Sequence, residues 1–157
     1  MAKEWRLGQS SVEDVFEMAA LVEQGGYEFY ERLIASSSKR SVQKELEFLR
    51  DEEAAHKAFF LDQLRLLGRT PRGTVGPELN AVLQAEFFGP LQEMLSSSDL
   101  DDNFKALGFG MTLEQKSIDL YGEMKAVASE MQKAGFDRII AEEEGHRHKL
   151  QLMRAHY

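Results

Sequence analysis

The sequence predicts an all-α protein that folds as a four-helix bundle built from two repeated helical hairpins. Four stretches carry apolar residues at spacings of three and four, which is the period of a helix. A Glu interrupts each of these apolar stripes near its middle. The pair Glu53 and His56 also returns ninety residues later as Glu143 and His146, in an equally helical setting, which indicates a duplicated hairpin.

Composition narrows the class of protein. At 157 residues, the chain is expected to form a single domain over residues 1–157 with one continuous core. It has no cysteine, which excludes disulfides, thiolate catalysis and any cysteine-bound iron centre on this chain. No apolar run reaches the length of a membrane span and no signal-peptide core is seen, so a cytoplasmic protein is expected. The net charge of -8 argues against nucleic-acid binding.

The first helix is expected to begin near residue 11. Ser10 and Ser11 each precede an acidic residue by three positions, as in a capping box. The helix is expected to end near residues 36–38, where three serines compete for backbone hydrogen bonds. Its stripe reads Phe16, Ala19, Glu23, Gly26, Tyr30 and Leu33.

A second helix is expected from about Ser41 to Leu67, with Gly68 as its stop. The joint between the first two helices is short, so they are expected to pack as an antiparallel hairpin. The second stripe reads Val42, Leu46, Leu49, Glu53, His56, Phe60, Leu64 and Leu67.

Residues 69–99 are expected to form a long crossover between helices two and three, because the segment is long enough to run the length of a bundle. A short helix is predicted over Pro77–Phe88, broken by Gly89 and Pro90. Together with exposed aromatics, the crossover favours a homodimer. Three apolar residues are expected to cover an open edge of the core or a partner subunit: Phe87, Phe88 and Leu91.

The third helix is expected to start at a cap beginning with Ser98 and to run to about Ala128. The fourth opens at Ser129, which forms a capping-box pattern with Gln132. Their stripes read Phe104, Leu107, Met111, Glu114, Ile118 and Tyr121, then Phe136, Ile139, Ile140, Glu143, His146, Leu150 and Met153.

The four interrupting carboxylates are expected to meet at one level. In helices of about 26 residues, roughly 40 Å long, each lies close to the midpoint. Burial of uncompensated carboxylates costs several kcal/mol per group, and no Lys or Arg falls on the stripes near that level. Two cations would balance the charge, and oxygen and imidazole ligands suit iron or manganese. The expected metal ligands are Glu23, Glu53, His56, Glu114, Glu143 and His146.

Other polar residues are weaker candidates. Glu144 and His148 offer a rival register on the fourth helix, although the repeat spacing favours the pair above. His148 and His156 are expected at the solvent surface. Three methionines are expected to be packing residues: Met111, Met124 and Met153. Three acids beside the ligands are expected to point outward, where one could guide iron inward: Asp51, Glu52 and Glu142.

One Glu from each of two helices, with a Glu-x-x-His pair from each of the other two, is the dinuclear carboxylate template of four-helix bundles. Over residues 11–156 the chain therefore resembles the ferritin-like superfamily, and within it the rubrerythrin-type di-iron domain. The motifs that carry the resemblance are Glu23-x6-Tyr30, Glu53-x2-His56, Glu114-x6-Tyr121 and Glu143-x2-His146.

The resemblance implies two bound iron ions, with manganese or zinc as substitutes. It implies that each His binds one ion, that Glu23 is a terminal ligand, and that Glu53 bridges the ions together with Glu114 or Glu143. Tyr30 and Tyr121 are similar to the outer-sphere phenols of the family, which hydrogen-bond to ligating carboxylates; the alternative is that they are ordinary core tyrosines.

Two departures from the family pattern bear on function. Rubrerythrins carry a further Glu three residues after the third-helix ligand, where this chain has Ser117. This favours a symmetric site with six ligands and argues against the family's redox-linked exchange of Glu for His. The cysteine-bound rubredoxin module is absent too, so electrons would come from a separate donor protein.

The resemblance implies a di-iron oxidoreductase that acts on peroxide or dioxygen, with peroxide reduction preferred and a role in oxidative stress. Two alternatives remain. One is a ferroxidase that stores iron, and the other is a non-enzymatic, metal-stabilised helical interaction module.

Overall fold

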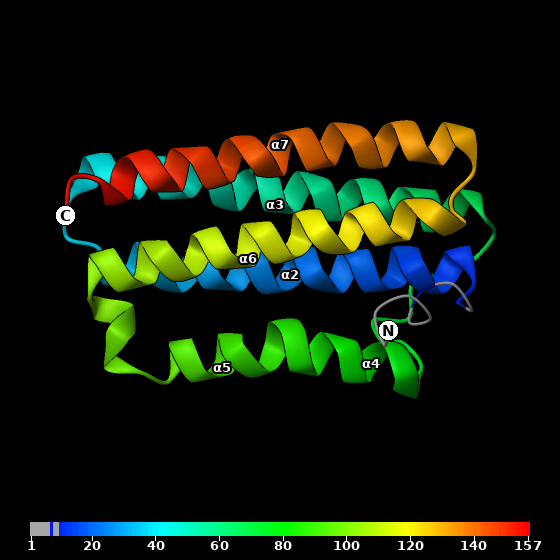
Figure 1. Cartoon of the computed structure of the whole chain (residues 1–157), viewed down its shortest axis with the longest axis horizontal. Coiled ribbons are helices and arrows are strands. Elements are labelled where there is room, and N and C mark those ends of the chain that lie inside the picture. Colours follow the sequence, from blue (N-terminus) through cyan, green and yellow to red (C-terminus); the bar gives the residue numbers. More distant parts are fainter. Residues whose placement is uncertain (1–6, 8–9) are drawn as a thin grey trace.

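The computed structural model describes Leu7 and residues 10–157, and all regular structure among these residues is helical, as predicted. Within them, no helix is both long and apolar enough to span a membrane. Four long helices run side by side as a bundle (Figure 1): α2 (Val12–Ser36), α3 (Arg40–Leu66), α6 (Asn103–Met124) and α7 (Glu130–Arg154).

The ends of these helices follow local sequence signals. The Ser11 hydroxyl accepts a hydrogen bond from the backbone of Asp14 and caps α2. Ser129 and Gln132 form the predicted capping box at the start of α7. After α3, Gly68 adopts a φ of 85°, the left-handed conformation that commonly terminates a helix. The predicted boundaries of α2 and α3 and the predicted start of α7 are correct to within one or two residues.

The core joins all four long helices through one aromatic cluster. Each helix contributes one fully buried ring, and the Phe16 and Phe136 rings stack with their centroids 5.5 Å apart. The Phe60 ring lies 5.2 Å from that of Tyr121. Packing on every side fixes the position of the Tyr121 ring, and this matters because its hydroxyl reaches the candidate site described below.

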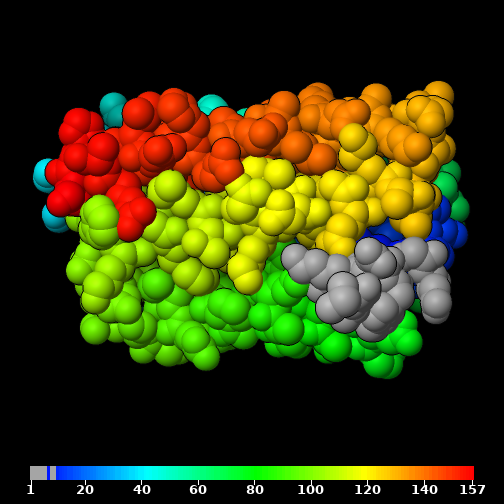
Figure 2. Space-filling view, in the orientation of Figure 1, coloured from blue at the N-terminus to red at the C-terminus, as the bar shows by residue number. Residues whose placement is uncertain are grey.

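The crossover lies as a layer along α2 and α6, and Figure 2 shows it as a continuous green band beside α6. It consists of α4 (Pro77–Leu83), the π-helical turn η1 (Gln84–Phe88) and α5 (Gly89–Leu95). Phe87 and Leu91 are buried against this chain's own bundle. The expectation that the crossover covers an edge of the core is met within one chain.

The predicted break at Gly89 and Pro90 is wrong, because the helical path continues through them. Pro90 lacks an N–H and would clash with a carbonyl in a regular α-helix, and the wider π-turn accommodates it. The Gly89 N–H bonds to the carbonyl of Gln84, five residues back. A Cβ on Gly89 would lie 2.6 Å from that carbonyl oxygen, so a larger residue does not fit there.

The third long helix starts later and ends earlier than predicted. Residues Ser98–Asp101 form a 3-10 turn (η2), and α6 begins after Asp102, whose carboxylate caps it. A second 3-10 turn, Lys125–Val127 (η3), follows its end. Phe104, assigned to the apolar stripe, is 47% exposed. The guanidinium of Arg154 covers its ring at 3.8 Å, which explains how the ring is tolerated at the surface.

A buried carboxylate fixes the start of the crossover. Glu17 on α2 is 1% exposed and accepts hydrogen bonds from the backbone N–H groups of Arg72 and Gly73, at 3.0 and 3.2 Å. Its carboxylate also lies 3.4 Å from the guanidinium of Arg69. These partners are more than fifty residues away along the chain, so Glu17 ties the loop after α3 to the first helix of the bundle.

Replacing Glu17 with Ala is expected to lower the free energy of unfolding by about 2–4 kcal/mol. It leaves two backbone donors without their acceptor and removes one of the two carboxylates beside the partly buried guanidinium of Arg69, which keeps Asp14 at 2.8 Å. Urea denaturation followed by circular dichroism measures this change. Glu28→Ala, an exposed site on the same helix, is the matched control and is expected to change stability by less than about 0.5 kcal/mol. Equal effects of the two substitutions would contradict the tie.

Candidate metal centre

The six residues predicted as metal ligands lie together at the middle of the bundle, and each is at least 95% buried. Their ligand atoms form two groups, within each of which every atom lies within 4.8 Å of the others. Glu53 and Glu143 belong to both groups, so the two groups overlap. One group adds Glu23 and His56, and the other adds Glu114 and His146.

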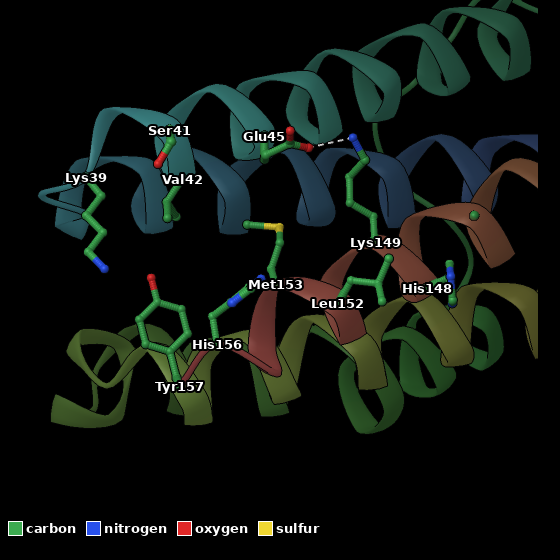
Figure 3. Close-up of a pocket in the computed structure, with 11 residues that line it drawn as sticks. Lys39, Ser41, Val42, Glu45, His148, Lys149, Leu152, Met153, His156 and Tyr157 are labelled. Carbon is green, nitrogen blue, oxygen red and sulfur yellow. Dashed lines mark hydrogen bonds and ion pairs between the residues drawn. The ribbon is translucent and has the colours of Figure 1, made fainter.

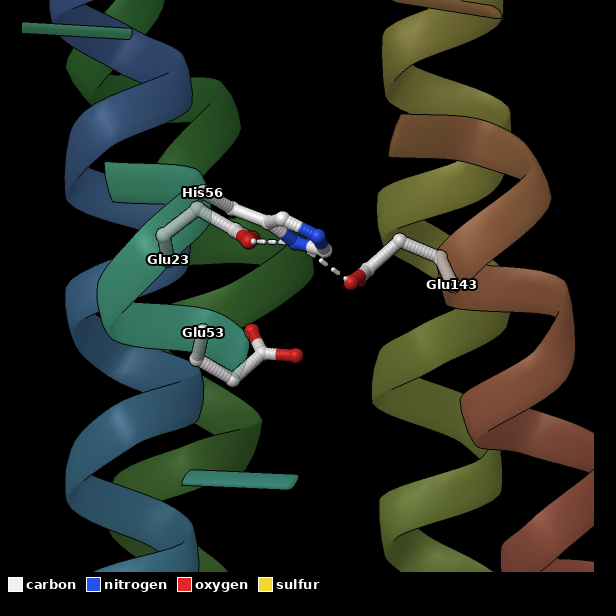
Figure 4. A group of neighbouring side chains, drawn as sticks. All are labelled: Glu23, Glu53, His56 and Glu143. Carbon is white, nitrogen blue, oxygen red and sulfur yellow. Dashed lines mark hydrogen bonds and ion pairs between the residues drawn. The ribbon is translucent and has the colours of Figure 1, made fainter. Parts of the chain in front are cut away.

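The first group is the more tightly closed (Figure 4). Nδ1 of His56, from α3, lies 2.7 Å from Oε1 of Glu23 and 2.9 Å from Oε1 of Glu143. Glu53 lies one helical turn before His56 on α3, so its carboxylate comes to the same side of the helix. Three helices therefore contribute to this group: α2, α3 and α7.

The second group is its looser counterpart. Nδ1 of His146, from α7, lies 3.2 Å from Glu143, 3.4 Å from Glu53 and 3.8 Å from Glu114. The two imidazole rings stack with their centroids 5.6 Å apart and an interplanar angle of 16°. In both groups Nδ1 of the imidazole faces the carboxylates. That nitrogen is therefore the one available to a cation.

Several buried polar atoms at this centre have no hydrogen-bond partner among the described residues. Neighbouring groups are within 4 Å of some of them, but not in hydrogen-bonding geometry. Orphaned buried polar atoms are costly, and a bound cation would satisfy acceptors of this kind. Oxygen and imidazole donors also fit iron, manganese or zinc. The orphaned atoms are Glu53 Oε1, Glu114 Oε2, both Glu143 oxygens and both His146 nitrogens.

Burial and mutual repulsion shift the pKa values of the carboxyls at this centre. Burial raises the pKa of Glu53 and of Glu143 well above the usual value for a carboxyl, and the charges of neighbouring carboxylates raise it further. Burial also raises the pKa of Glu23, although hydrogen bonds from His56 and Tyr121 oppose the shift. Burial thus shifts all three carboxyls toward their protonated forms.

Glu114 and the imidazoles shift to balance these acids. Burial would raise the pKa of Glu114, but interactions with His146, Glu143 and Tyr30 outweigh burial and lower it. Burial would lower the pKa of His146, but Glu114 and Glu143 raise it to about 10. The pKa of His56 is raised likewise, against burial, chiefly by Glu23. The raised pKa values of the two imidazoles favour bound protons at this centre.

Two phenols hold the carboxylates across the bundle. The Tyr30 hydroxyl, on α2, donates to Oε1 of Glu114 on α6 at 2.6 Å, and the Tyr121 hydroxyl, on α6, donates to Oε2 of Glu23 on α2 at 2.8 Å. Burial, with the charges of the nearby carboxylates, raises the pKa of both phenols well above 10. They therefore remain donors over the whole physiological pH range, in the positions expected for outer-sphere residues.

Sequence reasoning misplaced two acids. Glu52 and Glu142 were expected to point outward, but both are only partly exposed and approach the outer nitrogens of the imidazoles. Oε1 of Glu142 lies 2.7 Å from Nε2 of His56, and Oε1 of Glu52 lies 3.6 Å from Nε2 of His146. The hydrogen bond that Glu142 accepts thus favours a proton on Nε2 of His56 and leaves its Nδ1 to face the centre. Glu52 is too far from His146 for a hydrogen bond, but it places a negative charge on the same outer side of that imidazole. The signal available was a Glu directly before each Glu-x-x-His pair.

The remaining candidates lie away from the centre. Glu144 and His148 are exposed, so the rival register is not the one that the bundle buries. Asp51 and His156 are exposed as well. The Ser117 hydroxyl donates to the carbonyl of Leu113 on its own helix at 3.1 Å, and it brings no charge to the site.

A wide surface groove of about 820 Å³ lies apart from these ligands, between the start of α3 and the end of α7 (Figure 3). Its cationic side chains have partners within the groove: Lys149 pairs with Glu45 at 2.6 Å, and the Lys39 ammonium lies 5.6 Å from the centre of the Tyr157 ring. None of the six candidate ligands lines it.

Comparison with protein-family models, with curated proteins and with solved structures finds no match to this chain.

Proposed function

We propose that this chain is a rubrerythrin-like di-iron oxidoreductase with a ferritin-like bundle of two repeated hairpins, and that it reduces hydrogen peroxide. The observation that carries the proposal is the pair of overlapping buried groups, each with an imidazole, that share Glu53 and Glu143. Four carboxylates match the charge of two divalent cations, and the donor atoms match those that iron accepts.

The assignment of ligands follows from the two groups. Glu23 and His56 would hold one ion, and Glu114 and His146 the other. Glu53 and Glu143 belong to both groups, so they are the natural bridges between the ions. The resemblance left open whether Glu114 or Glu143 bridges the ions together with Glu53. Since Glu143 belongs to both groups and Glu114 to one, the geometry favours Glu143.

Bound iron would supply electron transfer to hydrogen peroxide, whose O–O bond breaks with uptake of two electrons and two protons to give two water molecules. A separate donor protein would provide the electrons. The family resemblance favours peroxide over dioxygen as the oxidant.

The chain's own residues prepare the site for this chemistry. Tyr30 and Tyr121 orient the terminal carboxylates by donating hydrogen bonds from the opposite hairpin. Glu142 holds the proton on Nε2 of His56, so that Nδ1 presents its lone pair to the centre. Glu52 lies 3.6 Å from Nε2 of His146 and acts on that imidazole through its charge. The apolar core around these residues excludes water, which strengthens each of these interactions.

Stopped-flow absorption of the protein loaded anaerobically with ferrous iron tests the proposal. Oxidation that is faster with stoichiometric hydrogen peroxide than with dioxygen, and that turns over when a reductant is present, supports peroxide reduction. Faster oxidation by dioxygen with accumulation of ferric iron would favour a ferroxidase instead. If the chain fails to retain iron, or if Glu53→Gln retains as much iron as the parent chain, the non-enzymatic helical interaction module becomes the favoured function.

A further inference from the structure

A small chamber adjoins the candidate metal centre, and neither imidazole lines it. Carboxylates of the centre, Glu53 and Glu114, line it together with Tyr30, and residues of the crossover close it. Its volume is about 10 Å³, close to the minimum that a single water molecule needs. The chamber is therefore contiguous with the ligands but closed to anything larger in this conformation.

Three side chains of the crossover form the outer wall: Phe87, Phe88 and Leu91. Phe87 and Leu91 are 4% and 2% exposed, so they are fixed parts of the core. Phe88 is only partly buried and so borders both the chamber and the surface. It ends the π-helical turn, next to the Gly89 and Pro90 joint. Of these three side chains, Phe88 is the one that can move without opening the core.

The opposite wall is kept open by two consecutive glycines in the middle of α2. A Cβ on Gly26 would lie 2.6 Å from Oε2 of Glu53, and a Cβ on Gly25 would lie 3.1 Å from Cε1 of Phe88. Glycine inside a helix costs about 1 kcal/mol relative to alanine. At Gly25 and Gly26 the missing side chains leave a space along α2 that runs from the Phe88 ring to the Glu53 carboxylate.

We propose that Phe88 sets the upper size of the oxidant that reaches the centre. A small rotation of its ring admits hydrogen peroxide, whereas a hydroperoxide with a branched alkyl group would need the ring displaced altogether. This inference rests on the proposed peroxide reduction and narrows its substrate class to the smallest peroxides. An organic hydroperoxide would be reduced in the same way: two electrons from the donor and two protons cleave its O–O bond and give an alcohol and water.

The first test compares kcat/KM for hydrogen peroxide and for tert-butyl hydroperoxide in the iron-loaded chain. Phe88→Ala is expected to raise the rate with tert-butyl hydroperoxide relative to hydrogen peroxide by about tenfold or more, because removing the ring creates the missing volume. Phe88→Leu, which retains more of the packing, is expected to give a smaller change of the same sign. The matched control is Phe59→Ala, a half-buried ring that packs on Phe60 and Arg138. An unchanged ratio in both Phe88 variants would overturn the proposal.

A second test does not depend on activity. Crystals of the full chain loaded with redox-inactive zinc are pressurised with xenon. Xenon is expected beside Gly25 in Phe88→Ala or Phe88→Leu and absent from the parent chain and from Phe59→Ala. Xenon in the parent chamber, or in none of the variants, would overturn the role of Phe88. If no variant reduces either peroxide, the proposed function fails, and the xenon result still decides whether Phe88 closes the chamber.

Discussion

Adding Mn²⁺ to the metal-free protein is expected to raise its melting temperature by about 10 °C or more at pH 8. Binding to the folded state alone contributes about 2.7 kcal/mol per site at a hundredfold excess over the dissociation constant. Two sites would contribute about twice that, and each kcal/mol is worth about 2–4 °C in a chain of this length. Thermal unfolding by circular dichroism under nitrogen measures the shift.

The pH dependence of this effect follows from the pKa shifts. The folded pKa of His146, about 10, lies above its unfolded value near 6.5, so the stability it contributes is complete below pH 6.5 and is lost as pH rises toward 10. The raised pKa values of Glu53 and Glu143 act with the same sign, since these carboxyls favour their protonated forms in the fold. The lowered pKa of Glu114 has the opposite effect, because the stability that this group contributes is lost as pH falls.

The metal-free protein is therefore expected to lose stability between pH 6 and pH 8, and the gain from Mn²⁺ is expected to grow over the same interval because fewer protons compete with the cation. Glu53→Gln serves as the control. It replaces a carboxyl that is costly to ionise in this buried position by a neutral amide of the same shape, so it is expected to stabilise the metal-free protein at pH 8 and to abolish most of the response to metal. A metal-free protein that gains stability with pH, and ignores Mn²⁺, would contradict this electrostatic description.

Glu53→Gln is expected to lower the affinity for both ions by at least about a hundredfold, whereas Glu23→Gln is expected to impair one ion only. The reason is geometric: Glu53 belongs to both groups of ligand atoms, and Glu23 belongs to one. Metal content after gel filtration measures the difference as a change from two ions per chain to none or to one.

Glu28→Gln, an exposed site on the same helix as Glu23, is expected to retain two ions and controls for a loss of charge that has no connection with the centre. Equal losses in the Glu53 and Glu23 variants would contradict the assignment of Glu53 as a bridge. If the Glu53 variant retained both ions, Glu53 would not be a metal ligand.

Sequence periodicity located the centre because the relevant information is local. An acid in the middle of an apolar stripe, repeated on four helices, has to be buried at one depth whatever the details of packing. Cap residues are equally local, and Ser11 and Ser129 act as predicted. The candidate ligands Glu53 and His56, one helical turn apart on such a stripe, were therefore predictable without a structure.

The features that were missed depend on contacts between distant segments. Glu142 lies about 100° from Glu143 around α7 and so seemed to face solvent, yet its side chain reaches an imidazole on another helix, 86 residues away in the chain. Glu17 is buried by partners from a loop that no periodicity relates to α2. The π-turn before Pro90 likewise depends on how the crossover packs, since a proline alone favours a break.

Anomalous diffraction from crystals of the chain loaded with iron or manganese is the most direct test of the central claim that buried carboxylates from four helices are held together by two cations. We expect two peaks between Glu53 and Glu143, one beside Nδ1 of His56 and the other beside Nδ1 of His146. No peak at this level, or a single ion on the outer side between Glu52 and Glu142, would contradict the claim.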